Sequence, residues 1–361
     1  MHRLWKALIG VCAAGAVAAS VGAASAQEPF YKGKRLTVLI NFAPGGGVDI
    51  NGRLFARYIA KHIEGQPTVI VQNMDGAAGL NGTNYLAQVA PKDGTVLGYL
   101  GAIPWQYVTT PERFRVDLRS YEFVAYEPIT TIFFVRRDVP PGMKVATDIV
   151  KAEGLVSGGL GATHARDLNI RLTLDMLGIP YRHVTGYSST EKARLAFQRN
   201  EINLTGETTP AYRRSIEGLV RAGEALPLFL NPDWNGEALS MPKQAEGLDV
   251  LQFQELYQRI NGTRPSGPLW DAYLANLALT STMSRFLVLP PGAPPAAQLA
   301  LQAAVERVNN DKAFAEETMN SIGYVPEAVT GPHTNRQVRQ ALNVSPDVRS
   351  FVADYIKRAK K

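Results

Sequence analysis

Apolar and polar positions follow a regular order between residues 35 and 100. Three apolar runs predict strands at 35–42, 67–73 and 94–100, and the first of them is predicted to be buried. After the first run, apolar residues recur at helical spacing from Ile50 to Ile63, and a second helix is predicted at about 83–90. Right-handed crossovers make the strands of such β–α–β–α–β units parallel. The pattern therefore predicts an α/β fold in which the loops after the first two strands share one edge of the sheet.

Both of these loops are rich in glycine. The first, NFAPGGGVDI, has three consecutive glycines at 45–47, and the second, NMDGAAGLNG, spans 73–82. Each leads into a predicted helix N-terminus, where backbone N–H groups and the helix dipole favour an anion. No lysine follows the glycines as in a P-loop, and Ile50 stands where a dinucleotide fingerprint needs its third glycine. The loops therefore suit a small anion such as a carboxylate, held by neutral donors, or they are only two tight turns.

The first 26 residues have the composition of a secretory signal peptide. Arg3 and Lys6 precede an Ala-rich apolar stretch that ends in Ala24-Ser25-Ala26, which predicts cleavage before Gln27. A membrane anchor is the alternative, but the apolar run is short for a span. We therefore expect an exported protein.

Charge and cysteine content narrow the chemistry of the exported chain. Cys12 is the only cysteine and lies in the predicted signal peptide, so we expect no disulfide, thiol nucleophile or cysteine metal site. The formal charge of +6 becomes +4 when the two cations Arg3 and Lys6 are removed. This small and thinly spread excess of positive charge favours anionic ligands, but it does not have the clustering that indicates nucleic-acid binding.

The sequence gives little indication of catalysis. It contains neither a G-x-S-x-G elbow nor an H-E-x-x-H motif, and its five histidines are scattered. We therefore predict no catalytic residue, no metal site and no cofactor.

The segment 31–100 resembles the start of the periplasmic solute receptors of tripartite tricarboxylate transporters, the Bug family. That family opens with F-x-P-G-G-x-x-D, continues with a loop like N-x-x-G-A-x-G-x-x-G, and then has a P-x-D-G-x-x-L step. The matching residues are Phe42, Pro44, Gly45, Gly46 and Asp49; Asn73, Gly76, Ala77, Gly79 and Gly82; and Pro91, Asp93, Gly94 and Leu97. The similarity continues more weakly to the C-terminus.

The resemblance implies a periplasmic-binding-protein-like fold, with two α/β domains joined by two crossover strands and a ligand cleft between them. We expect the first domain at 28–130 plus 284–361 and the second at 131–283. The segments ITTIFFVRRDVP (129–140) and TMSRFLVLPP (282–291) would be the outgoing and returning crossovers. The segment 250–283 looks longer than the family norm and adds two predicted helices.

The resemblance also implies a ligand site between the two glycine loops and the second domain. In the second domain the histidine of the family is retained as His164. Gly161 stands where the family has a hydroxyl residue, and Thr163 would substitute for it. The segment VTGYSS (184–189) replaces the V-P-Y-K-G of the family. The predicted ligand-binding residues are Phe42, Ala43, Gly45, Gly46, Gly47, Asp49, Asn73, Gly76, Ala77, Ala78, Gly79, Asn81, Thr163, His164, Tyr187 and Glu207.

Several of these residues have a simpler alternative role. Asp49 is interpreted first as a helix N-cap, and otherwise as the partner of a bridging water or a ligand amine. His164 is either held by the backbone or donates to the ligand. Tyr187 is a surface or core side chain, or a donor to a ligand oxygen, and Glu207 is solvated or accepts from a ligand hydroxyl or ammonium. The helix predicted for ARLAFQRNE is expected to carry no chemistry of its own.

The implied function is a monomeric receptor in the periplasm of a Gram-negative bacterium. It would capture a small mono- or dicarboxylate and deliver it to the large and small integral-membrane subunits of the transporter, with no nucleic acid involved. Two alternatives remain open: a secreted enzyme acting on an organic acid in the same cleft, and a receptor that feeds a sensor kinase.

Overall fold

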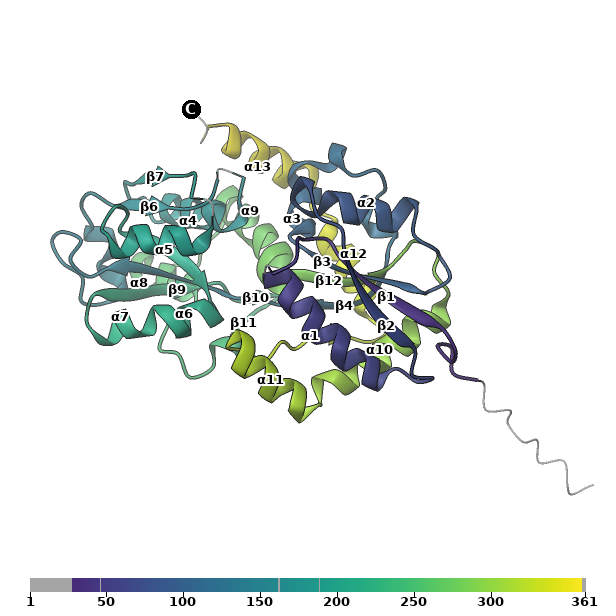
Figure 1. Cartoon of the computed structure of the whole chain (residues 1–361). Coiled ribbons are helices and arrows are strands. Elements are labelled where there is room, and N and C mark those ends of the chain that lie inside the picture. The colour runs from purple at the N-terminus through teal and green to yellow at the C-terminus, as the bar shows by residue number, and fades with distance from the viewer. Residues whose placement is uncertain (1–27, 46, 162, 188, 359–361) are drawn as a thin grey trace, which may run out of the picture.

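The computed structural model describes residues 28–45, 47–161, 163–187 and 189–358 (Figure 1). The predicted signal peptide and Gly46 lie outside the described residues. Two sheets lie side by side, each with helices packed against it, so the predicted α/β fold is confirmed. None of the helices in the described ranges is long and apolar enough to cross a membrane.

The first sheet has the strand order β13-β4-β12-β3-β1-β2. Its strands are β1 (Arg35–Ile40), β2 (Thr68–Asn73), β3 (Val96–Gly101), β4 (Glu122–Glu127), β12 (Arg285–Leu289) and β13 (Val329–Thr330). The strand β1 pairs in parallel with β2 and β3, as predicted, whereas β12 runs antiparallel to β3 and β4. The glycine loops therefore do share the carboxyl edge of this sheet.

Helices cover both faces of the first sheet, which explains its continuous apolar strands. The helices are α1 (Gly47–His62), α2 (Leu80–Gln88), α3 (Ile103–Thr109), α10 (Pro295–Asn309), α11 (Lys312–Ile322), α12 (Thr334–Leu342) and α13 (Pro346–Arg358). Successive β1 side chains point to opposite faces: Val38 and Ile40 join the cluster with α1 and α10, whereas Leu39 joins the larger core on the other side. The face of β1 that carries Leu39 also carries Arg35 and Thr37, so it becomes polar toward the start of the strand.

Two sequence-based boundaries of this sheet are wrong by a few residues. The first strand ends at Ile40 rather than 42, because Asn41 turns its side chain toward the neighbouring loops. The second helix begins at Leu80 rather than about 83, because Gly79 in the left-handed region starts it and Gly82 lies within it. Both glycines look like loop residues in the sequence.

The second sheet has the strand order β7-β6-β8-β5-β9. Its strands are β5 (Thr131–Arg136), β6 (Val156–Gly158), β7 (Arg182–Val184), β8 (Leu204–Thr208) and β9 (Ala225–Leu230). The strand β6 pairs in parallel with β7 and β8, and β5 is antiparallel to β8 and β9. Helices α4 (Ala165–Met176), α5 (Thr190–Gln198), α6 (Thr209–Ser215) and α7 (Glu217–Arg221) accompany it.

The remaining elements connect the two sheets or lie in loops. The two helices predicted within 250–283 are present as α8 (Phe253–Asn261) and α9 (Pro268–Leu277), followed by a π-helical turn at Ala278–Thr282. A short hairpin is formed by β10 (Asp233–Trp234) and β11 (Leu239–Ser240). Short 3-10 turns lie at Ala77–Gly79, Pro111–Arg113, Leu118–Ser120, Ala146–Lys151 and Lys243–Ala245.

The chain passes between the two sheets at two adjacent places. Only residues 128–130 separate β4 from β5, and the chain returns through α9 and the π-helical turn into β12. Where the return ends, at the first residue of β12, Arg285 Nη1 lies 3.5 Å from Glu127 Oε2, which also accepts a 2.6 Å hydrogen bond from Tyr99. All three side chains are buried, so the two connections are joined by an ion pair shielded from water.

Candidate functional site

Asn41 ties together the three loops at the carboxyl edge of the first sheet. Its side chain is fully buried (0% exposed) immediately after β1. Its Nδ2 donates to the carbonyls of Gly79 (3.3 Å) and Gly101 (3.1 Å), and its Oδ1 accepts from the Gly101 N–H at 2.9 Å. The loops after β1, β2 and β3 are therefore held by one side chain, which the sequence prediction missed.

The second glycine loop has an unusual backbone conformation. Four consecutive residues have positive φ angles, namely Gly76 (105°), Ala77 (48°), Ala78 (55°) and Gly79 (93°). The left-handed conformation costs a non-glycine residue about 1–2 kcal/mol, so the two alanines store strain. From α3, Gln106 Nε2 holds the loop by donating to the Ala78 carbonyl at 2.8 Å.

This conformation exposes backbone donors. Ala77 and Ala78 are exposed at the surface, and neither N–H donates a hydrogen bond to another described residue. A side chain at Gly79 would meet Asn41 Nδ2 at 2.4 Å, so the loop has room only for glycine there. The loop can therefore offer two adjacent neutral donors to an anion.

Asp49 braces the first glycine loop instead of capping the helix. It lies within the first turn of α1, so the N-cap interpretation is wrong. Its carboxylate accepts hydrogen bonds from the Gly45 N–H (2.9 Å), Arg53 Nε (2.9 Å) and Asn73 Nδ2 (2.7 Å). Burial raises the pKa of Asp49, but these three hydrogen bonds lower the pKa more, and the net pKa is below its usual value. Asp49 and Asn73 thus join the first loop to the end of β2.

The loop before α4 in the second sheet approaches this edge. Trp105 on α3 donates from Nε1 to the Thr163 carbonyl at 3.3 Å. The neighbouring His164 precedes α4, and its buried Nδ1 has no hydrogen-bond partner among the described residues. Burial, and then the charge of Arg166, lower the pKa of His164 to about 4, so the imidazole is neutral at pH 7. A neutral imidazole with an unpartnered nitrogen suits a hydrogen bond to a ligand.

Glu207 is buried beside two arginines, so the prediction that it is solvated is wrong. Its side chain is only 1% exposed, and Arg194 Nη1 donates to its Oε1 at 3.1 Å. Arg166 Nη1 lies 4.0 Å from Oε2 and donates to the Gly206 carbonyl at 2.8 Å. Glu207 is therefore not solvated, whereas its role as an acceptor from a ligand remains a prediction. Arg194 of α5 is the side chain that pairs with it. The Arg166 Nε is buried without a partner in the described structure.

A buried carboxyl shapes the loop before α4. Asp167 Oδ2 accepts from the Gly161 N–H at 2.5 Å, and a Cβ at Gly159 would lie 1.3 Å from Asp167 Oδ1. Burial raises the pKa of Asp167 to about 6. His183 Nε2 lies 3.9 Å from the same oxygen, and its Nδ1 is 2.8 Å from Ser157 Oγ. The loop that carries His164 is thus positioned from behind by a polar cluster in the core of the second sheet.

The other predicted residues are near these loops but have fewer contacts. The Phe42 carbonyl accepts from Asn73 Nδ2 at 2.8 Å, and Asn81 Nδ2 donates to the Asp75 carbonyl at 3.2 Å. Tyr187 is half-buried beside Gly158, and burial raises its pKa. Ala43 and Gly47 are exposed, as is Gly76. No group of acidic, histidine or cysteine side chains in the described ranges is arranged to hold a metal ion.

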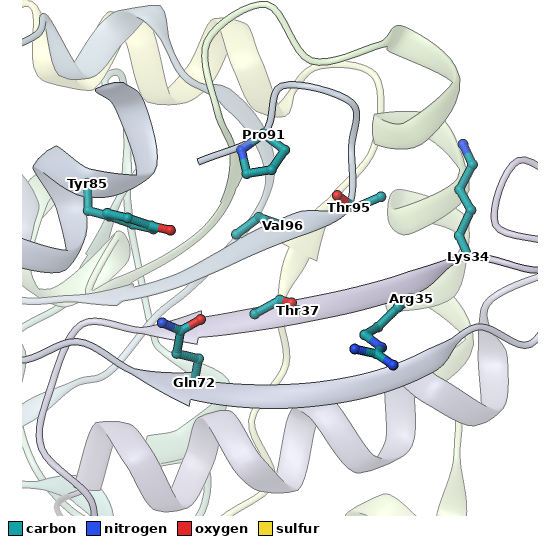
Figure 2. A pocket seen from close by; sticks show the side chains of 8 residues that line it. All are labelled: Lys34, Arg35, Thr37, Gln72, Tyr85, Pro91, Thr95 and Val96. Atoms are coloured by element: carbon teal, nitrogen blue, oxygen red, sulfur yellow. The ribbon is translucent and has the colours of Figure 1, made fainter. Parts of the chain in front are cut away.

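A separate pocket of about 460 Å³ opens on the first sheet (Figure 2). Its lining residues are Lys34, Arg35, Thr37, Gln72, Tyr85, Pro91, Thr95 and Val96. Thr37 pairs with Val96 before the carboxyl ends of their strands, so the pocket is away from the glycine loops. The Lys34 ammonium lies 3.4 Å from the centre of the Phe30 ring, and Figure 2 shows Lys34 and Arg35 pointing in different directions. The two cations therefore do not converge on one anion.

Comparison with known proteins agrees with this architecture. No family model matches the sequence. The chain is 24% identical over 338 residues to a UPF0065 protein of Bordetella pertussis, with 91% of this chain and 93% of that protein covered.

Solved structures share the two-sheet fold. A TctC solute binding protein from Polaromonas has a TM-score of 0.65 at 15% identity and covers 91% of this chain and 99% of its own. The periplasmic binding protein BugD has a TM-score of 0.53 at 18% identity, covering 91% and 98%. Rpa4515 of R. palustris with adipate has a TM-score of 0.57 at 16% identity, covering 91% and 97%. The fold is that of periplasmic solute-binding proteins. The predicted resemblance to the Bug-family receptors of tripartite tricarboxylate transporters is confirmed.

Proposed function

We propose that this protein is a periplasmic receptor for a small organic mono- or dicarboxylate. The observation that carries the proposal is a pair of exposed N–H groups, at Ala77 and Ala78, that have no partner among the described residues. They lie beside an α-helix N-terminus and the other glycine loop. Neutral donors on a preformed loop bind an anion without the cost of burying a cation away from water. The adipate of the R. palustris structural neighbour belongs to the same ligand class.

The far end of the ligand would meet the loop before α4. His164 Nδ1 and Arg166 Nε are both buried without partners in the described structure, and an unsatisfied buried polar group costs about 1–3 kcal/mol. A second carboxylate or a hydroxyl on the ligand would supply the missing acceptor for Arg166 and a partner for His164. The Trp105–Thr163 hydrogen bond keeps this loop beside the first sheet.

The receptor would work by closure of the two sheets around the ligand. The chain crosses between them at residues 128–130 and at the turn before β12, so few backbone residues need to absorb a rotation. A ligand that contacts both sides binds the closed state better and shifts the population toward it. The closed form would present a composite surface to the large and small membrane subunits of a tripartite tricarboxylate-type permease.

Binding is tested by calorimetry and thermal shift with adipate, using its neutral diamide as the matched probe. We expect roughly micromolar affinity for a carboxylate ligand and stabilisation of about 2.7 kcal/mol at 100 times the dissociation constant. The variant Ala78→Leu should lose binding, because the side chain would occupy the space of the anion. Ala222→Leu, at an exposed helix end, is the control. Equal affinity in a folded Ala78→Leu protein would refute the site.

A second measurement separates a receptor from an enzyme and from a sensor. The bound acid should be recovered chemically unchanged after hours, whereas an enzyme would consume it. Deletion of the gene should abolish uptake of the radiolabelled acid in whole cells. Normal uptake, combined with a lost transcriptional response to the acid, would favour a receptor that feeds a sensor kinase.

A further inference from the structure

A cavity of about 850 Å³ lies between two segments of the chain. One segment comes after β9 of the second sheet, and the other comes after β12 of the first sheet. One wall is formed by the β10–β11 hairpin and the segment 240–244, and the opposite wall by α11 and the segment 323–329. Pro128 in the outgoing connection and Arg213 of α6 complete it, and none of the glycine-loop residues lines it. A cavity of this size accommodates a small organic molecule and is far larger than the voids of ordinary packing.

The walls of this cavity are mostly apolar. Met241 and Met319, on opposite walls, are 42% and 51% exposed and face the cavity together. Further apolar lining comes from Pro128, Pro242, Tyr324, Val325, Pro326 and Val329. Methionine side chains are flexible and polarizable, so they adapt to the shape of an apolar ligand. The cavity therefore suits a molecule with an apolar body.

The charges of the cavity are paired, with one exception. Lys243 Nζ lies 2.7 Å from Glu327 Oε1 and joins the two walls. Arg213 lies 3.7 Å from Glu217 and donates to the Glu246 carbonyl at 2.8 Å. Asp233 has no cationic partner within the described ranges, and its Oδ1 is buried with no hydrogen-bond donor. The unmatched group is therefore a carboxylate acceptor.

We propose that this cavity is a second binding site, for an amine with an apolar body whose ammonium group donates to Asp233. Asp233 supplies the one charge that the cavity does not neutralise internally, and the methionines and prolines enclose the apolar part. Burial also raises the pKa of Asp233 to about 6, as expected for a carboxyl that lacks a cation. The proposal is independent of the carboxylate site, because the two sites share no residue.

A bound amine would also hold the two walls together. Tyr324 lines the cavity, and its hydroxyl accepts hydrogen bonds from Asn51 on α1 (2.7 Å) and from Arg285 at the return connection (3.1 Å). The second site is thus in contact with the connections between the sheets.

The test uses the full exported protein and phenethylamine at pH 8, with 3-phenylpropionate and 2-phenylethanol as probes of matched shape. We expect saturable calorimetric binding of the amine with a dissociation constant below about 1 mM, and at least tenfold weaker binding of the acid and the alcohol. The variant Asp233→Asn should weaken amine binding at least tenfold and leave adipate binding unchanged. Asp249→Asn, at an exposed acid that does not line the cavity, is the matched control and should bind the amine normally.

A second variant keeps the test decisive if Asp233→Asn does not fold. Met319→Trp fills the cavity from an exposed position, so it should fold and lose amine binding. Equal binding of amine and acid, no saturable amine binding, or unchanged affinity in a folded Asp233→Asn or Met319→Trp protein would overturn the proposal.

Discussion

Replacing Asn41 with leucine should separate the three loops of the candidate site from one another. Leucine has nearly the same shape as asparagine but makes none of its three hydrogen bonds. The Gly79 carbonyl keeps a partner, because Thr83 Oγ1 also donates to it at 2.9 Å. The main loss falls on the buried Gly101, whose N–H would have no acceptor and whose carbonyl would lose a donor.

The magnitude follows from these bonds. An unsatisfied buried N–H costs about 1–3 kcal/mol, and each further hydrogen bond contributes about 0.5–1.5 kcal/mol. We therefore expect Asn41→Leu to reduce the free energy of unfolding by about 3 kcal/mol in urea titrations, and to weaken adipate binding as the loops move independently.

Asn84 provides the matched control. It also bonds two backbone groups, the Arg113 carbonyl at 3.3 Å and the Arg115 N–H at 3.0 Å, but these bonds are exposed to solvent. Water can replace the side chain there, so Asn84→Leu should cost less than about 1 kcal/mol. If the two variants are destabilised equally, or if Asn41→Leu costs less than about 1 kcal/mol, our account of Asn41 is wrong.

Three further predictions concern the same loops. Gly159→Ala should cost several kcal/mol in urea titrations, because its Cβ would lie 1.3 Å from Asp167 Oδ1; a loss below about 1 kcal/mol would mean that the cluster rearranges freely. Burial and the charge of Arg171 lower the pKa of His183 to about 4. The free energy of unfolding should therefore decrease as the pH falls from about 6.5 to 4, and His183→Gln should reduce this decrease by about 3 kcal/mol. Asp167 acts in the opposite direction, because its raised pKa favours folding at low pH. An unchanged pH profile in His183→Gln would contradict the assignment of His183. Ala78→Gly should raise the free energy of unfolding by up to about 1 kcal/mol, because glycine adopts the positive φ angle without strain. The same variant should bind the carboxylate more weakly in calorimetry, because its loop is less rigid. Tighter binding would argue against a preorganised loop.

The sequence predicts the parts of the fold that depend on local pattern. The parallel order of β1, β2 and β3 follows from the strand–helix alternation, and the pairing of the glycine loops follows from that order. Asn41 could not be identified as a tie, because a polar residue after a strand usually belongs to a turn. The engagement of Glu207 by Arg194 joins a strand end to a helix 13 residues earlier, and only the folded structure brings them together. The division into domains at 130/131 and 283/284 remains a prediction.

The hydrogen bond from Trp105 to the Thr163 carbonyl gives the protein a built-in reporter of its own motion. The indole N–H belongs to the first sheet's α3 and its acceptor to the loop before α4, so any separation of the two breaks this bond. In the bonded state the indole proton should be shifted downfield and slow to exchange with deuterium. After separation, it should exchange at the rate of a free indole and the emission of Trp105 should move to the red. The proposed separation of the two sheets can therefore be timed without attaching a label.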